Sequence, residues 1–168
     1  MTQKEFVNKY LPFAKETEKK TGISAIAILA QGALESGWGS VAPGNMIFGI
    51  KDTDGVNGNE QLLTTTEYSR SATAKFPRIQ KVTPVLKNGQ KWFNYMIKDY
   101  FRKYDTPEGS FTDHAKFFLT NSRYAEALKV KADPYKFIDA IAKAGYATAP
   151  DYATILKGIA KTIEKLTK

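Results

Sequence analysis

The sequence of 168 residues contains no cysteine and a single histidine, His114. The absence of cysteine excludes disulfide frameworks and thiolate metal sites. One histidine excludes a multi-histidine zinc site and disfavours a serine–histidine catalytic pair, so we expect neither a metal nor any other cofactor. No run of about 20 apolar residues is present, and we expect no membrane insertion. The opening residues MTQKEFVNKY lack the apolar core of a signal peptide, which favours a mature form or another route of export.

The charge balance is basic. Lysine and arginine number 25 against 17 aspartates and glutamates, which gives a net charge of +8 and indicates an anionic partner surface. Charge alone does not choose between cell-wall polymers and nucleic acid. No nucleic-acid recognition motif accompanies the charge, so we expect no nucleic-acid partner. The length predicts one domain over residues 1–168, which we expect to act as a monomer.

Apolar spacing and capping residues predict a mainly helical chain. The expected helices cover residues 3–20 and 24–35 and begin again at Ser110, Asp133 and Asp151. Pro12 is expected to kink or restart the first helix, because proline removes a backbone hydrogen bond. Ser110 and Asp113 are expected to cap one helix start, and the Asp133–Pro134 pair is typical of another.

The middle of the chain predicts a small β-lobe at about residues 60–104. Glycine, proline, asparagine and aspartate dominate residues 41–59, which we interpret as loop. Extended segments are predicted over residues 61–69, 75–86 and 91–104, the last two joined at Asn88–Gly89. Pro77 and Pro84 confine the second segment to an edge or an irregular path. The expected fold class is therefore α+β.

The segment from Ser24 to Glu35 predicts a buried helix that carries a carboxylate at its C-terminal end. Residues 25–34 are apolar or glycine except for Gln31. Desolvation and the negative end of the helix dipole would both raise the pKa of Glu35. Gly37 and Gly39 would stop the helix and bring Trp38 against it. A protonated carboxyl at neutral pH is the proton donor that glycosidic bond cleavage needs. The alternative is a glutamate that frays into solvent.

Acid-catalysed glycoside cleavage usually needs a second carboxylate. From the residues alone the candidates are Glu67 and the list Asp52, Asp54, Glu60 and Asp105. The D-x-D-G fragment at Asp52 has part of a calcium-loop pattern but lacks the remaining ligand spacing, which favours an acidic turn.

The motifs ALESGWG, APGN, FGIK, TTTEY, NSRYAEAL and AGYATAPDYA occur in this order along the chain. Together they resemble glycoside hydrolase family 73, the peptidoglycan-cleaving endo-β-N-acetylglucosaminidases of autolysins, flagellar assembly proteins and phage lysins. The resemblance runs from about Phe6 to Leu166. It implies a lysozyme-like fold whose β-lobe flanks a cleft, and hydrolysis of the bond between N-acetylglucosamine and N-acetylmuramic acid. It also implies action on the cell wall, outside the cell or in the periplasm.

The resemblance assigns Glu35 as general acid and Glu67, in TTTEY, as the second catalytic carboxylate. It implies that four aromatic residues contact the glycan: Trp38, Phe48, Tyr124 and Tyr146. The chain departs from the family pattern at Gly109 and Ala149, where acidic residues are frequent, and neither position is expected to do chemistry. Two other functions stay open: a lytic transglycosylase that uses the same acid, and a catalytically silent wall-binding module.

Overall fold

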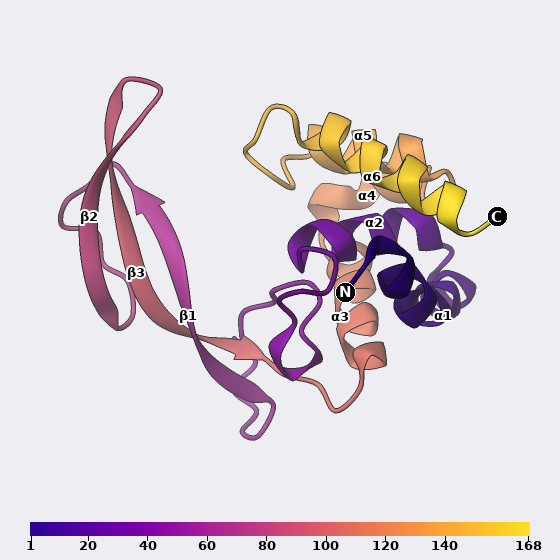
Figure 1. Ribbon diagram of the computed structural model, residues 1–168, viewed down its shortest axis with the longest axis horizontal. Helices are drawn as coiled ribbons and strands as arrows, with labels where there is room; N and C mark the ends of the chain where they lie inside the picture. The colour runs from indigo at the N-terminus through magenta and orange to yellow at the C-terminus, as the bar shows by residue number, and fades with distance from the viewer. The chain divides into compact units, whose positions relative to one another are not determined.

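The computed structural model describes residues 1–168, which form two compact units, a helical unit of Met1–Gly49 with Tyr104–Lys168 and a sheet unit of Ile50–Lys103 (Figure 1). The helical unit contains α1 (Gln3–Thr21), α2 (Ala25–Glu35), η1 (Pro43–Asn45), α3 (Pro107–Thr120), η2 (Ser122–Tyr124), α4 (Ala125–Leu128), α5 (Pro134–Lys143) and α6 (Tyr152–Leu166). The sheet unit contains β1 (Glu60–Ser69), β2 (Ile79–Lys87) and β3 (Gln90–Arg102). The predicted α+β class is confirmed. None of the helices combines the length and apolar character needed to cross a membrane.

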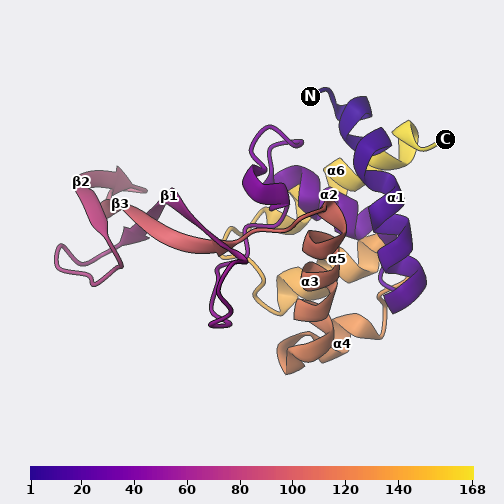
Figure 2. The ribbon, with the colours of Figure 1, turned by 90° about the horizontal axis from the view of Figure 1, so that it is seen from below.

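The central element of the helical unit is α2, which packs against α1, α5 and α6 (Figure 2). Nearly all its residues from Ala25 to Ala33 are buried, as an all-round apolar helix requires. The Ser24 hydroxyl accepts a hydrogen bond from the Ala27 N–H at 3.3 Å and caps the first turn. The predicted buried helix is confirmed.

The predicted restart at Pro12 is wrong, because α1 runs through that residue as one helix, while a kink there stays a prediction. Pro12 lies on the exposed side of α1, as does Asn8 one turn before it. The carbonyl that loses its partner to proline is that of Asn8, and there it can bond to water. The helix is also held at its start by a capping box between Thr2 and Glu5.

The predicted cap at Ser110 is also wrong, because α3 begins three residues earlier, with Pro107 in its first turn. Ser110 lies inside the helix and is buried, and its hydroxyl accepts a hydrogen bond from the Ile47 N–H at 3.0 Å. This bond ties the loop after η1 to α3. The predicted start of α5 is confirmed, since the Asp133 carboxylate accepts from the N–H groups of Tyr135 and Lys136.

The strands form one antiparallel sheet in the order β1-β3-β2. Asn88 and Gly89 join β2 to β3 with φ values of 51° and 75°, the conformation of a tight hairpin turn. Pro84 lies in the edge strand β2, as predicted, opposite Phe93. One sheet face includes the buried side chains of Tyr95 and Ile97, while the alternate residues of β1 and β3 are largely exposed.

Candidate active site

Glu35 is the last residue of α2. Beyond it the chain reverses through Gly37, Trp38 and Gly39, which all have positive φ. The Trp38 N–H closes the turn by donating to the Ala33 carbonyl at 2.7 Å. Two of these residues are glycines because they adopt this conformation at little cost, while Trp38 adopts it against the preference of its side chain. The indole is half-buried, with its ring 5.6 Å from that of Phe6.

The carboxyl of Glu35 reaches solvent, yet burial by the surrounding protein raises its pKa above the ordinary value. Two tyrosines, Tyr146 and Tyr152, lie close enough to interact electrostatically with the Glu35 carboxylate. Burial, followed by the negative charge of Glu35, raises the pKa of Tyr146. Burial also raises the pKa of Tyr152 to about 12; the hydrogen bond from Gln31 acts to lower it, and the charge of Glu35 adds to the rise. Both hydroxyls are therefore neutral donors beside the carboxyl. The arrangement favours the protonated form of the carboxyl, the form that can donate a proton.

A buried polar chain lies one turn before Glu35. The Gln31 side-chain amide donates to the Tyr152 hydroxyl at 3.2 Å, and its carbonyl oxygen is 2.7 Å from Nε2 of His114. Because an amide oxygen can only accept, His114 carries a proton on Nε2. Gln31, which is itself held by His114, thus positions the Tyr152 hydroxyl near Glu35. Sequence reasoning missed this chain, although Gln31 is the one polar residue in an otherwise apolar helix.

His114 stacks on Phe48, with ring centroids 3.9 Å apart and planes 2° apart. Burial lowers the pKa of His114 to about 3. Its folded-state pKa is thus below its unfolded value near 6.5, so the unfolded state binds the extra proton. The contribution of His114 to stability is present above pH 6.5 and is lost as the pH falls toward 3.

We expect the free energy of unfolding to fall with decreasing pH in this window, with His114 contributing up to about 1.4 kcal/mol per pH unit. Denaturant unfolding of the wild type and of His114→Gln at several pH values measures this. The glutamine keeps a donor for Gln31 and has no titration of its own. An equally steep pH dependence in the variant would show that His114 is not the titrating group.

The four predicted aromatic contacts all lie in the helical unit, in two settings. Trp38 and Tyr146 are half-buried and keep part of their surface open. Phe48 and Tyr124 are buried, with 6% and 2% of their surface exposed. The Tyr146 ring stacks on Phe118, with centroids 5.6 Å apart. A sugar contact stays a prediction for all four, and the half-buried rings of Trp38 and Tyr146 are the better placed for it.

Glu67 lies on β1 of the sheet unit, where its carboxylate is 3.0 Å from the Lys51 ammonium. The same ammonium is 3.2 Å from the Asp99 carboxylate. Partial burial acts to lower the pKa of Lys51, but the hydrogen bonds to Glu67 and Asp99 outweigh it and the pKa is raised. Lys51 therefore stays charged beside the two carboxylates. The predicted site did not include Lys51 or Asp99.

The alternative carboxylates Asp52 and Asp54 lie with Arg102 in the same unit. The Asp54 carboxylate is 3.0 Å from the Arg102 guanidinium and also accepts hydrogen bonds from the Val56 N–H and the Asn59 side chain. These bonds hold a turn together. Glu60 also serves this loop, since its carboxylate accepts from the Gly58 N–H at 2.8 Å. No group of three or more histidine, aspartate or glutamate side chains is arranged to hold a metal ion.

The chain matches the model of a family described as mannosyl-glycoprotein endo-beta-N-acetylglucosaminidase over residues 11–165. It is 31% identical to the peptidoglycan hydrolase FlgJ of Vibrio parahaemolyticus over 96% of this chain, but over only 47% of that protein. The chain thus spans about half the length of this relative. It spans still less of others, for example 36% of the Pseudomonas aeruginosa FlgJ.

Solved structures show the same fold. The glycoside hydrolase domain of Salmonella typhimurium FlgJ, in a C-terminally truncated form, matches 98% of this chain and 99% of its own, with a TM-score of 0.73 and 28% identity. The catalytic domain of the autolysin Auto from Listeria monocytogenes matches with a TM-score of 0.73 and 25% identity, over 98% of this chain and 86% of its own.

Proposed function

The chain belongs to the glucosaminidase family of glycoside hydrolases, and we propose that it cleaves bacterial peptidoglycan. The bond we assign is the β-1,4 bond between N-acetylglucosamine and N-acetylmuramic acid, with N-acetylglucosamine on the new reducing end. The observation that carries the proposal is Glu35, a solvent-accessible carboxyl with a raised pKa at the end of a buried helix. The relatives named as peptidoglycan hydrolases support the choice of substrate. The site of action would be the cell wall, outside the cytoplasmic membrane.

The first chemical step is proton transfer from Glu35 to the glycosidic oxygen. As the bond between the anomeric carbon and that oxygen breaks, the leaving sugar takes the proton and positive charge develops on the ring that remains. Because its pKa is raised, Glu35 holds its proton at a higher pH than an ordinary glutamate, which favours its role as the acid. The neutral hydroxyl of Tyr152, positioned by Gln31, can donate a hydrogen bond to the acid or to the substrate.

Glu67 is the second carboxylate of the proposal. The carboxylate of Glu67, paired with Lys51, can take a proton from water as the water oxygen attacks the anomeric carbon. In the substrate-assisted alternative the acetamido oxygen of N-acetylglucosamine attacks first, and a carboxylate stabilises the ring it forms. Both routes need Glu35 as donor.

Analysis of the product ends tests the function directly. Purified peptidoglycan digested with the chain and reduced with borohydride is expected to yield fragments that end in the alditol of N-acetylglucosamine, identified by mass spectrometry. A transglycosylase would leave anhydro-muramic ends that resist borohydride, and a muramidase would leave reducible muramic acid ends. Unaltered peptidoglycan would indicate a silent binding module.

A further inference from the structure

The sheet unit has an exposed face that the proposed chemistry does not use. Cross-strand partners share a face, and Tyr68, Asn94 and Thr83 lie opposite one another in the register of β1, β3 and β2. Glu67 points to the other face, with Tyr95. We call the face with Tyr68 the cationic face; it consists of Leu62, Thr64, Thr66, Tyr68, Lys81, Thr83, Val85, Lys87, Trp92, Asn94, Met96, Lys98 and Tyr100, with Arg70 and Arg78 over its rings.

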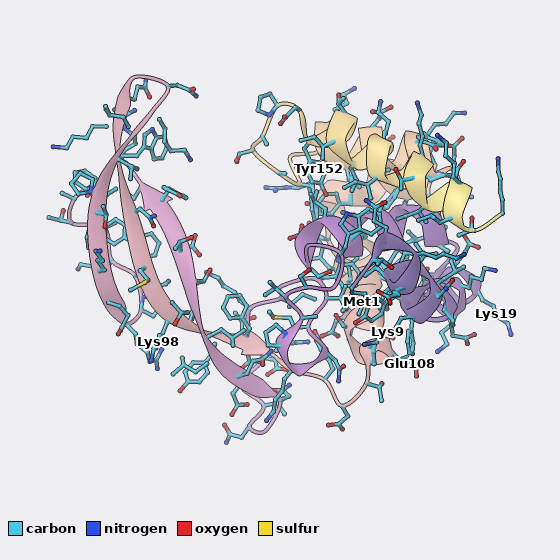
Figure 3. The ribbon with its side chains drawn as sticks, viewed as in Figure 1. Met1, Lys9, Lys19, Lys98, Glu108 and Tyr152 are labelled. Atoms are coloured by element: carbon cyan, nitrogen blue, oxygen red, sulfur yellow. The ribbon has the colours of Figure 1, made fainter.

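Basic residues are concentrated in the segment that builds most of this face, although Lys91, opposite Leu86, lies on the other face. Between Glu67 and Asp99 there are seven basic residues and no acidic one, a charge of +7 out of the +8 of the whole chain. Four of its apolar or aromatic side chains are also open to solvent: Leu62, Tyr68, Met96 and Tyr100, at 43%, 47%, 37% and 38%. Figure 3 shows side chains along both sides of the strands, with Lys98 labelled. Exposed apolar surface with charge of one sign is typical of an interaction surface.

Aromatic rings hold several of these cations in place. The Lys87 ammonium is 4.1 Å from the Tyr68 ring centroid and 5.6 Å from that of Trp92. The Arg78 guanidinium lies 4.7 Å from the Tyr100 ring and that of Arg70 lies 5.4 Å from the Trp92 ring. Such contacts order a side chain without neutralising its charge. By contrast, the ammonium of Lys157 on α6 is paired with the Asp139 carboxylate at 2.9 Å.

This arrangement selects the chemistry of the partner. The rings of Tyr68, Trp92 and Tyr100 already carry cations, so they offer few open faces for stacking nucleic-acid bases. Between Tyr68 and Met96 the face presents ordered positive charge over apolar surface, and the nearest carboxylates, those of Asp52 and Glu60, lie beside Tyr100 at the far end of the face. It is complementary to a polymer with regularly spaced anionic groups.

We propose that the cationic face binds the carboxylates of peptidoglycan peptide stems. Because Glu67 projects from the opposite face of the same sheet, the bound stems belong to a strand neighbouring the one that is cleaved. The sheet would thus hold one strand of the mesh while its other face meets the strand to be cut. The choice of partner rests on the proposed function, but binding is measured separately from cleavage.

The test is co-sedimentation with purified cell-wall sacculi from which phosphodiester polymers have been removed, in the cold and at low salt. The triple variant Lys81→Gln, Lys87→Gln, Lys98→Gln is expected to bind roughly ten- to a hundredfold more weakly, since each cation near an anionic surface contributes a few-fold. The matched control Lys15→Gln, Lys19→Gln, Lys116→Gln makes the same charge change on exposed lysines of the helical unit and should bind like the wild type. Amidation of the stem carboxylates should abolish the difference between the variants.

Turnover of short soluble glycan fragments should be unchanged in the triple variant, since these have no neighbouring strand. Equal weakening by the control set would show that net charge alone matters, and would overturn the proposal. So would a difference seen only with walls that keep their phosphodiester polymers, or stronger and equally lysine-dependent binding to duplex DNA or to anionic lipid vesicles. If the protein cleaves no cell wall but still shows the lysine-dependent binding, the proposed function is contradicted and the binding proposal stands.

Discussion

Replacing Glu35 with glutamine is expected to lower the turnover of peptidoglycan by at least about a hundredfold, the low end of the contribution of a general acid. Glutamine keeps the shape of the side chain but has no acidic proton to give to the glycosidic oxygen. Clearing of a cell-wall suspension measures the rate. Glu126→Gln is a matched control, because Glu126 lies exposed on α4 and pairs only with Lys129 on the surface in a 2.9 Å contact. A Glu35→Gln variant that keeps most of the wild-type rate would remove Glu35 from the mechanism.

The same substitution should not destabilise the fold. The pKa of Glu35 is raised in the folded state, so its favourable contribution to stability is present below the unfolded pKa and is lost as the pH rises. At neutral pH the ionised form is therefore less favourable in the folded chain than in the unfolded one. A neutral glutamine avoids that cost, and the melting temperature at pH 7 should equal or slightly exceed that of the wild type. A large drop would mean that the lost rate reflects unfolding.

The sequence carried enough local information to predict the elements on which the site is built. The apolar run and Ser24 predict α2, and Asn88–Gly89 predicts the hairpin, because each pattern reports on the backbone a few residues away. The same local reasoning placed Glu35 at a helix end. It failed at Ser110, whose partner is the Ile47 N–H, a contact that no helix-capping rule contains.

The side chains around Glu35 and Glu67 could not be predicted from the sequence for the same reason. Gln31 meets Tyr152 across 121 residues of chain and meets His114 across 83. Lys51 reaches Glu67 from a segment predicted as loop. Such contacts depend on tertiary packing, and a single sequence shows only that a polar residue lies in an apolar helix. Roles for these residues can be argued only from the folded structure, which brings them together.

Glu67→Gln is expected to lower the turnover number by roughly tenfold to a hundredfold or more, with little change in the Michaelis constant, if Glu67 activates water. The amide oxygen of glutamine can still accept a hydrogen bond from Lys51, so the local structure should survive. Steady-state kinetics on purified walls gives both constants. A smaller loss is expected if the acetamido group of the substrate attacks first, because the carboxylate then acts only on a group already in place.

The controls for Glu67 come from its own surroundings. Asp99→Asn alters the other carboxylate on Lys51, and Asp54→Asn alters the one held by Arg102, so both should retain most of the wild-type turnover. Added azide, a nucleophile that needs no base, should restore part of the rate of Glu67→Gln and none of that of Glu35→Gln, because only the latter lacks its proton donor.

An unaffected Glu67→Gln, together with a slow Asp52→Asn, Asp54→Asn, Glu60→Gln or Asp105→Asn variant, would move the second carboxylate to that residue.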